Sequence, residues 1–286
     1  MGLQVEVVND GGAETIVFIS GWPDTPRLWD KAVEEFSNEY RCVSIGLPMY
    51  SSREEAKALG VYRKSGYNMD EVVDMIAETI DESCRGHFPI TLCIFDWGCV
   101  YGFQYIGKHS EKVCRTIAID VGPVWMKAPR LQDLIGLFLA GVFYQYRVIF
   151  YYLVARFVPF LQDWADRSAR KYMAYMASES DTDISELTAD VGYNYWNMHL
   201  DRVATYLGLR KPQEPLDLGT FPRHPVLFFI GTKKDMKFYP ERWLESLQQR
   251  SDHSEAVFLP AVHWVMVACR EAFHSKMREF LTATKK

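Results

Sequence analysis

Short apolar runs that alternate with helical stretches constrain the fold of this chain more than any other feature. Most of these runs are continuously apolar, as expected of parallel strands that are covered on both faces. Between two of them, residues 69–84 place Val73, Ile76 and Ile80 on one face at the helical period. The alternation predicts an α/β fold with a doubly wound, mostly parallel sheet. The predicted strands are Val5–Val8, Ile16–Ile19, Cys42–Ile45, Ile90–Phe95, Ile117–Ile119, Val226–Ile230 and Ala256–Leu259.

The alternation stops near Trp125 and resumes near Pro225. Residues 125–215 number 91 of the 286, yet they hold nine of the 16 tyrosines. We therefore predict a core formed by residues 1–124 and 216–286, with a helical cap over 125–215 inserted between two of its strands. A cleft between cap and sheet is the expected place for a ligand pocket. The aromatic excess fits an apolar pocket, and it equally fits helices that need large side chains to pack.

Charge and cysteine usage exclude several classes of function. Lys plus Arg number 32 against 37 for Asp plus Glu, so the net charge is −5 and a nucleic-acid partner is not expected. The six cysteines lie mostly in apolar stretches without CxxC spacing, which indicates reduced, buried thiols. No metal motif occurs, and neither a metal nor another cofactor is expected. The N-terminal decapeptide resembles no signal peptide, which favours a cytoplasmic protein.

One segment, Leu134–Phe160, carries only Arg147 and Arg156 as charged residues. Its longest uncharged run, Leu134–Tyr146, has 13 residues. A helix that spans a bilayer needs about 20 apolar residues, so this run is too short. We favour a buried or lid helix here, and a peripheral membrane contact is the alternative. The sequence predicts no particular oligomeric state.

The run Ile90–Phe95 leads directly into Asp96-Trp97-Gly98-Cys99, and a helix is expected over residues 100–109. Strand, sharp turn and helix in this order are typical of a nucleophile elbow, here with aspartate where an esterase has serine. The small residues after Trp97 allow the turn, and the helix N-terminus directs its N–H groups to the same point. On residues 90–100 alone, an ordinary N-cap aspartate is the preferred interpretation.

Two further strand ends favour the elbow. His263 follows the last predicted strand, and it alone among the seven histidines has the setting expected of a general base above the sheet. Asp235 follows the strand Val226–Ile230 and offers a carboxylate that would hold the imidazole. The chain order of nucleophile, acid and histidine is that of the α/β hydrolases.

A fourth strand end carries Ser20-Gly21-Trp22-Pro23-Asp24. The glycine lets the backbone approach a bound group, and the N–H of Trp22 is then able to point inward. Together with the N–H of Trp97 it would form an oxyanion hole with two donors. A plain turn is the alternative, because this is also good turn chemistry.

These segments resemble the epoxide hydrolase and haloalkane dehalogenase branch of the α/β-hydrolase superfamily. The resemblance rests on Asp96-Trp97-Gly98, Gly21-Trp22-Pro23-Asp24, Asp235 and His263-Trp264, and it extends over essentially the whole chain. The family usually has histidine where this chain has Ser20, and it often has a smaller residue where Cys99 stands. These departures loosen the geometry of the oxyanion hole but remove no catalytic atom.

An aspartate nucleophile implies displacement at a saturated carbon, because its attack on an ester would give an anhydride more reactive than the substrate. Water activated by His263 would then hydrolyse the alkyl ester on Asp96, while Trp22 and Trp97 bind the oxyanion. Asp235 is the preferred partner of the imidazole. Asp120 is the second choice, because some dehalogenases place the acid at that strand end.

The leaving group decides between a diol and an alcohol as the product. Family epoxide hydrolases supply two cap tyrosines as proton donors, and residues 143–146 and 193–198 resemble the cap segments that carry them. We therefore nominate Tyr144 and Tyr195. Three tyrosines in neighbouring registers are alternatives: Tyr146, Tyr152 and Tyr193.

A leaving halide would instead need weak N–H donors in an apolar pocket, such as the indoles of Trp97 and Trp196. We favour an epoxide hydrolase that acts on a small apolar substrate. A haloalkane dehalogenase with the same nucleophile is one alternative. A catalytically silent binding protein is the other, and Ser20 and the apolar Leu134–Phe160 segment are its only support.

Overall fold

The computed structural model describes residues 2–123, 143–211, 217–234 and 236–285. Within these ranges seven strands form one sheet in the order β1-β3-β2-β4-β5-β6-β7. Strand β1 runs antiparallel to β3, and the other neighbouring pairs are parallel. The predicted α/β class is thereby confirmed. The strands are β1 Val5–Val8, β2 Thr15–Ile19, β3 Arg41–Ile45, β4 Ile90–Phe95, β5 Val113–Ile119, β6 Val226–Gly231 and β7 Glu255–Leu259.

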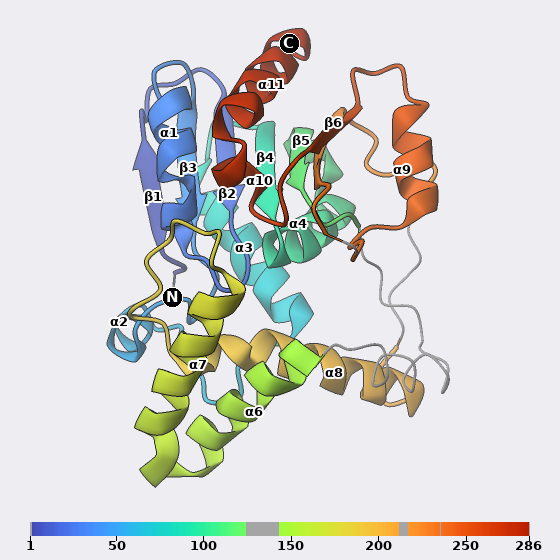
Figure 1. Cartoon of the computed structure of the whole chain (residues 1–286). Coiled ribbons are helices and arrows are strands. Elements are labelled where there is room, and N and C mark those ends of the chain that lie inside the picture. The colour runs from blue at the N-terminus through green and yellow to red at the C-terminus, as the bar shows by residue number, and fades with distance from the viewer. Residues whose placement is uncertain (1, 124–142, 212–216, 235, 286) are drawn as a thin grey trace.

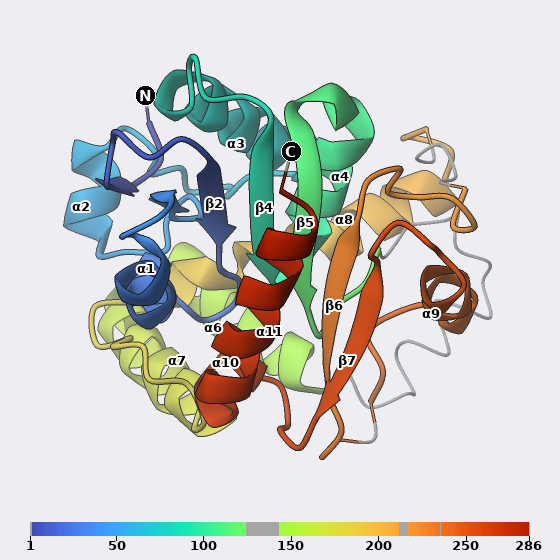
Figure 2. The same cartoon turned by 90° about the horizontal axis from the view of Figure 1, so that it is seen from above.

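The apolar runs form strands because helices cover both of their faces. Every residue of β2 is buried, and alternate side chains enter opposite layers. Ile16 and Phe18 face one layer, whereas Val17 and Ile19 face the other. Figure 2 shows α1 and α11 on one side of the sheet and α3 and α4 on the other. The core helices are α1 Asp30–Phe36, α2 Arg53–Ala58, α3 Met69–Ser83, α4 Trp97–Lys108, α9 Glu241–Gln248, α10 Val265–Ala268 and α11 Arg270–Ala283.

Between β5 and β6 the chain leaves the sheet and forms helices that lie beyond one end of the strands (Figure 1). The described cap helices are α6 Phe143–Phe157, α7 Gln162–Met176 and α8 Tyr193–Tyr206. The helical insertion agrees with the prediction. Both predicted domain boundaries, at 124/125 and 215/216, lie outside the described residues and stay predictions. The first part of Leu134–Phe160 lies outside them too.

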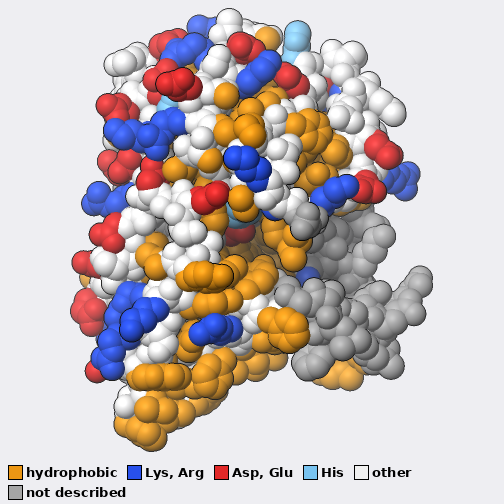
Figure 3. All heavy atoms as spheres, in the orientation of Figure 1, with side chains coloured by type: hydrophobic (Ala, Val, Ile, Leu, Met, Phe, Trp, Pro, Cys, Tyr) orange, Lys and Arg blue, Asp and Glu red, His pale blue; other side chains and the backbone are white. Residues whose placement is uncertain are grey.

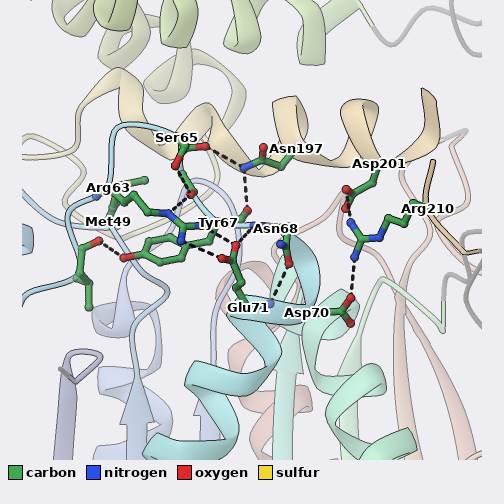
Figure 4. A network of polar contacts seen from close by, with 12 residues as sticks. Met49, Arg63, Ser65, Tyr67, Asn68, Asp70, Glu71, Asn197, Asp201 and Arg210 are labelled. Atoms are coloured by element: carbon green, nitrogen blue, oxygen red, sulfur yellow. Dashed lines mark hydrogen bonds and ion pairs between the residues drawn. The ribbon is translucent and has the colours of Figure 1, made fainter. Parts of the chain in front are cut away.

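A polar network fastens α8 to the core helix α3 (Figure 4). Asn197 donates to the carbonyl oxygen of Tyr67 at 2.8 Å. Arg210, which follows α8, forms ion pairs with Asp201 of that helix and, at 2.6 Å, with Asp70 of α3. The helix that carries Tyr195 is therefore held both to α3 and to the segment directly before α3.

The fold also bears on cysteine pairing, membrane crossing and metal ligation. All six cysteines are free, and four of them are buried, as predicted. None of the helices in the described ranges is both long enough and apolar enough to cross a bilayer. Among the same residues, no group of three or more His, Cys, Asp or Glu side chains is placed to hold a metal ion.

Candidate active site

Asp96 stands at a sharp turn between the end of β4 and the start of α4. Its φ is 53° and its ψ is −119°, a conformation that a non-glycine residue rarely adopts. Such strain costs of the order of 1–3 kcal/mol and persists only where the surroundings enforce it. A Cβ on Gly98 would collide with the carbonyl oxygen of Ile19, so the turn also requires a residue without a side chain there. This is the strand–turn–helix geometry of a nucleophile elbow.

The loop after β2 lies against this turn. The backbone N–H of Trp22 donates to Asp96 Oδ1 at 2.6 Å. A Cβ on Gly21 would collide with both that oxygen and the amide nitrogen of Trp97, so only glycine fits this approach. Of the two amides proposed as oxyanion-hole donors, that of Trp22 thus binds Asp96 Oδ1, and that of Trp97 lies against Gly21 in the same place.

His263, on the loop between β7 and α10, contacts two carboxylates. Its Nε2 lies 3.3 Å from Asp96 Oδ2, and its Nδ1 donates to Asp120 Oδ2. The ring packs against Phe95, with 4.6 Å between the ring centroids. The aspartate and the histidine nominated from the sequence are thus within hydrogen-bond reach of each other.

The carboxylate on the other side of the imidazole belongs to Asp120, the second choice of the sequence analysis. Asp120 is fully buried directly after β5, and its Oδ1 accepts from the backbone N–H of Gly231 at 3.0 Å. Because β5 is the neighbour of β4, its end lies beside the elbow. Asp235, the first choice, lies outside the described residues.

The two carboxylates set the ionisation of the histidine. Burial of His263 lowers the pKa of its imidazole, but hydrogen bonds to Asp120 and Asp96 outweigh burial and raise it to about 9. The free site therefore holds an imidazolium between two carboxylates at neutral pH. A neutral histidine that accepts a proton requires that one of these negative charges be lost.

Aromatic side chains from the cap cover Asp96 and its hydrogen-bonding amide. The ring of Tyr195, which is 3% exposed on α8, lies 5.2 Å from Trp97 and 5.6 Å from Trp22 between centroids. Tyr144, on α6, lies 5.7 Å from Tyr195 and 6.4 Å from Trp22. In Figure 3 the surface is hollowed between the core and the cap. The structure therefore brings both nominated tyrosines to the elbow.

The hydroxyl groups of these tyrosines are protonated at neutral pH. Burial raises the pKa of Tyr144, and it raises that of Tyr195 well above the ordinary value for a phenol. The Tyr144 oxygen accepts from Gln145 Nε2 at 3.1 Å, while Gln145 Oε1 lies 3.1 Å from His199 Nε2. The Tyr144 oxygen accepts a hydrogen bond from the Gln145 amide, so the hydroxyl hydrogen of Tyr144 is available to a different acceptor.

The tyrosines in neighbouring registers have described contacts with residues other than Asp96. Tyr146 stacks on His199 at 5.3 Å, and the hydroxyl of Tyr152 donates to the carbonyl oxygen of Lys64 at 3.0 Å. Tyr193 is fully buried, with its ring 6.5 Å from that of Tyr50. Trp196 is partly buried and packs against the main apolar cluster. Among the described ring contacts, none joins it to the aromatic residues at the elbow, which are Trp22, Trp97, Tyr144 and Tyr195.

Asp24 is a site residue to which the sequence analysis gave no role. It is fully buried, and it accepts from the indole N–H of Trp264 at 2.8 Å and from the hydroxyl of Ser180 in the cap. Burial raises the pKa of its carboxyl to about 6. Asp24 thus connects the loop after β2, the loop that carries His263 and the cap. Its place in a turn sequence gave no signal of these distant contacts.

Comparison with known proteins agrees with this fold. The sequence model of the alpha/beta hydrolase fold matches residues 14–267 of this chain. Epoxide hydrolase 1 of Caenorhabditis elegans is 26% identical over 106 residues, which are 37% of this chain and 24% of that protein. A haloalkane dehalogenase of Sphingobium indicum is 23% identical over 112 residues, which are 39% of this chain and 36% of that protein. The matches thus span less than half of these relatives.

A solved structure with a third activity has the same fold. A thermophilic esterase from Thermogutta terrifontis superposes with a TM-score of 0.65 at 17% identity, over 99% of this chain and 94% of that one. At this identity the likeness concerns the fold and leaves the substrate open. The family model covers strands β2 to β7, the elbow and the histidine loop. The chain therefore belongs to the α/β-hydrolase fold family.

Proposed function

We propose that this protein is an epoxide hydrolase that forms a transient alkyl ester on Asp96. The observation that carries the proposal is a carboxylate at the elbow, within reach of His263 and beneath two cap tyrosines. A carboxylate forms a stable ester at a saturated carbon, whereas its attack on an ester or amide would give a more reactive anhydride. The proposed substrate is a small apolar epoxide, and the proposed reaction uses no cofactor.

In the first step Asp96 Oδ2 attacks one epoxide carbon, because the N–H of Trp22 already occupies Oδ1. An electron pair of Oδ2 forms the new carbon–oxygen bond while the ring carbon–oxygen bond breaks. The leaving oxygen takes a proton from Tyr195 or Tyr144, and the phenolate regains one from solvent. The product of this step is a β-hydroxyalkyl ester of Asp96.

In the second step water attacks the carbonyl carbon of this ester. Esterification removes the negative charge of Asp96, which is one of the two charges that raise the pKa of His263. The imidazole then loses its proton more readily and accepts one from water. Charge that collects on Oδ1 is stabilised by the N–H groups of Trp22 and Trp97. Asp120 stabilises the imidazolium, and the diol leaves as the carboxylate is restored.

A haloalkane dehalogenase is the second candidate, and one observation favours it. The indole N–H of Trp22 is buried and has no hydrogen-bond partner within the described part of the chain. A halide ion accepts weak bonds from such donors, and the ester on Asp96 would be hydrolysed in the same way. The two buried phenols favour the epoxide, because a halide needs no proton on leaving.

The His263→Ala variant tests the proposal, because it should form the ester but fail to hydrolyse it. We expect ester hydrolysis to slow by at least about a thousandfold, so that intact mass shows an adduct on Asp96 after exposure to an epoxide. Asp96→Asn is the matched control and should show none. No adduct across a broad panel of epoxides and alkyl halides would refute an aspartate nucleophile. If the protein binds a ligand without converting it, and Asp96→Asn does not change this binding, the chain is a binding protein.

Phenylalanine variants of the cap tyrosines separate the two candidate substrates. For an epoxide hydrolase, Tyr195→Phe and Tyr144→Phe should each lower the rate of ester formation from an epoxide by about a hundredfold, because the leaving oxygen loses a proton donor. Single-turnover adduct formation in the His263→Ala background measures this step alone. Halide release that survives in both variants, with no diol from any epoxide, would instead establish the dehalogenase.

A further inference from the structure

The outer face of the cap carries a row of aromatic side chains in contact with solvent. Phe143, Phe150 and Phe157 recur every seven residues along α6, so they lie on one side of the helix. They are 72%, 52% and 67% exposed, respectively. In globular proteins large apolar side chains that gather on one exposed face usually mark a surface that binds something. Figure 3 shows hydrophobic side chains gathered along the edge of the molecule that the cap forms.

The row continues where α6 turns into α7. Phe160 is 86% exposed in the connection, and Trp164 is 42% exposed in the first turn of α7. The ring of Trp164 lies 6.3 Å from that of Phe150, so the two helices share one aromatic surface. We call residues 143–176 the cap hairpin.

The cap hairpin is basic although the chain is acidic. It holds five cations and two carboxylates, so its net charge is +3, whereas the whole chain has −5. One of the two carboxylates, Asp166, is bound by Arg53 of the core. Among the described residues, no ion pair joins the cations of the hairpin to a carboxylate. These cations are Arg147, Arg156, Arg167, Arg170 and Lys171.

Two of these cations line a groove between α6 and α7. The groove has a volume of about 390 Å³, and tyrosines form much of its wall. Arg147 lies over the ring of Tyr172 at 4.5 Å, and Lys171, the residue before Tyr172 on α7, lines the same groove. A guanidinium and an ammonium beside exposed aromatic rings fit a phosphate group at the boundary between water and acyl chains.

We propose that the cap hairpin binds the surface of an anionic lipid bilayer. The aromatic row enters the boundary between headgroups and acyl chains, and Arg147 and Lys171 bind lipid phosphates. The positive charge of the cap hairpin favours an anionic bilayer over a two-fold dimer of the chain. In such a dimer one basic hairpin would lie against the other and repel it. This inference does not depend on the chemistry proposed at Asp96.

Vesicle sedimentation of the full chain tests the proposal. The protein should bind phosphatidylcholine vesicles that contain phosphatidylserine, bind pure phosphatidylcholine far more weakly, and detach as salt is raised. Arg147→Gln with Lys171→Gln should weaken binding about 30-fold, since each cation near such a surface contributes about a factor of five. Phe150→Ser with Phe157→Ser should weaken it at least about tenfold through lost apolar contact.

The control variant changes charge by the same amount on the core. Lys31→Gln with Lys237→Gln removes two exposed lysines far from the cap helices in sequence, and it should leave vesicle binding unchanged. Thermal unfolding of each variant verifies that it is folded. The proposal would be overturned if the control variant lost as much vesicle binding as the hairpin variants, or if neither hairpin variant changed vesicle binding. It would also be overturned if the protein showed no preference for phosphatidylserine. A different outcome would assign the face to a second copy of the chain: the natural protein forms an oligomer and binds no vesicles, and Phe150→Ser with Phe157→Ser makes it monomeric.

Discussion

The buried carboxylate of Asp120 has a cation among its partners. Besides the amide of Gly231 and the imidazole of His263, it contacts Lys234 Nζ at 2.7 Å. The Lys234 side chain is only 10% exposed, so water screens its charge weakly. A positive charge on the far side of Asp120 disfavours an imidazolium at His263. Lys234 thus opposes the two carboxylates that raise the pKa of the histidine.

Lys234→Met should therefore raise the pKa of His263. Because ester hydrolysis requires a neutral imidazole, the acidic limb of its pH–rate profile should move up by about one pH unit. The rate at higher pH should be retained. Single-turnover hydrolysis of the alkyl ester across pH measures the shift, and Lys237→Met, a lysine that is 58% exposed, is the control. A uniform loss of rate at every pH would assign Lys234 a purely structural role.

Between elements, a buried ion-pair cluster fastens the cap to the core. Arg53, at the start of α2, binds Asp166 of α7 at 2.6 and 3.0 Å and Asp190 at 2.5 Å. The three side chains are 12%, 8% and 11% exposed. Two carboxylates share one guanidinium here, so removing the arginine would leave both buried without a counter-ion.

Arg53→Met should lower the free energy of unfolding by about 3–5 kcal/mol, because it strands two buried charges. Arg278→Met removes a similar arginine that binds Glu35 and Glu39 but is 43% exposed, and it should cost less than about 1 kcal/mol. Urea denaturation measures both. Adding Asp166→Asn and Asp190→Asn to Arg53→Met should recover most of the loss. A loss of similar size in the Arg278 variant would contradict the role of burial.

At the scale of the molecule, local patterns predicted the strands, because burial on both faces leaves signals in neighbouring residues. The elbow was predicted only with the help of the other strand ends, since residues 90–100 alone favour an ordinary N-cap aspartate. The partner of His263 was not predicted in this way. Asp120 and Asp235 both follow strands and both precede the histidine, so chain order cannot separate them. Sheet order brings the end of β5 beside the elbow. Contacts of Asp24 and Lys234 likewise depend on loops that meet only in the folded chain.

Asp24 affects the stability of the whole molecule. Its folded pKa of about 6 lies above the ordinary value of 3.8, so the folded state binds its proton more tightly than the unfolded chain. The resulting stability is complete below pH 3.8 and is lost as pH rises to about 6. A shift of this size corresponds to about 3 kcal/mol. Since an asparagine does not titrate, Asp24→Asn should remove this dependence while its amide oxygen still accepts from Trp264.

Urea denaturation of both proteins across this pH range measures the difference. Asp24→Asn should match the natural chain near pH 3.8 and exceed its free energy of unfolding by up to about 3 kcal/mol above pH 6. Asp163→Asn, which changes an exposed carboxylate on α7, is the control and should give a small difference at every pH. Equal pH dependence in Asp24→Asn and the natural chain would mean that Asp24 is solvated, and that the link between cap and histidine loop opens in solution.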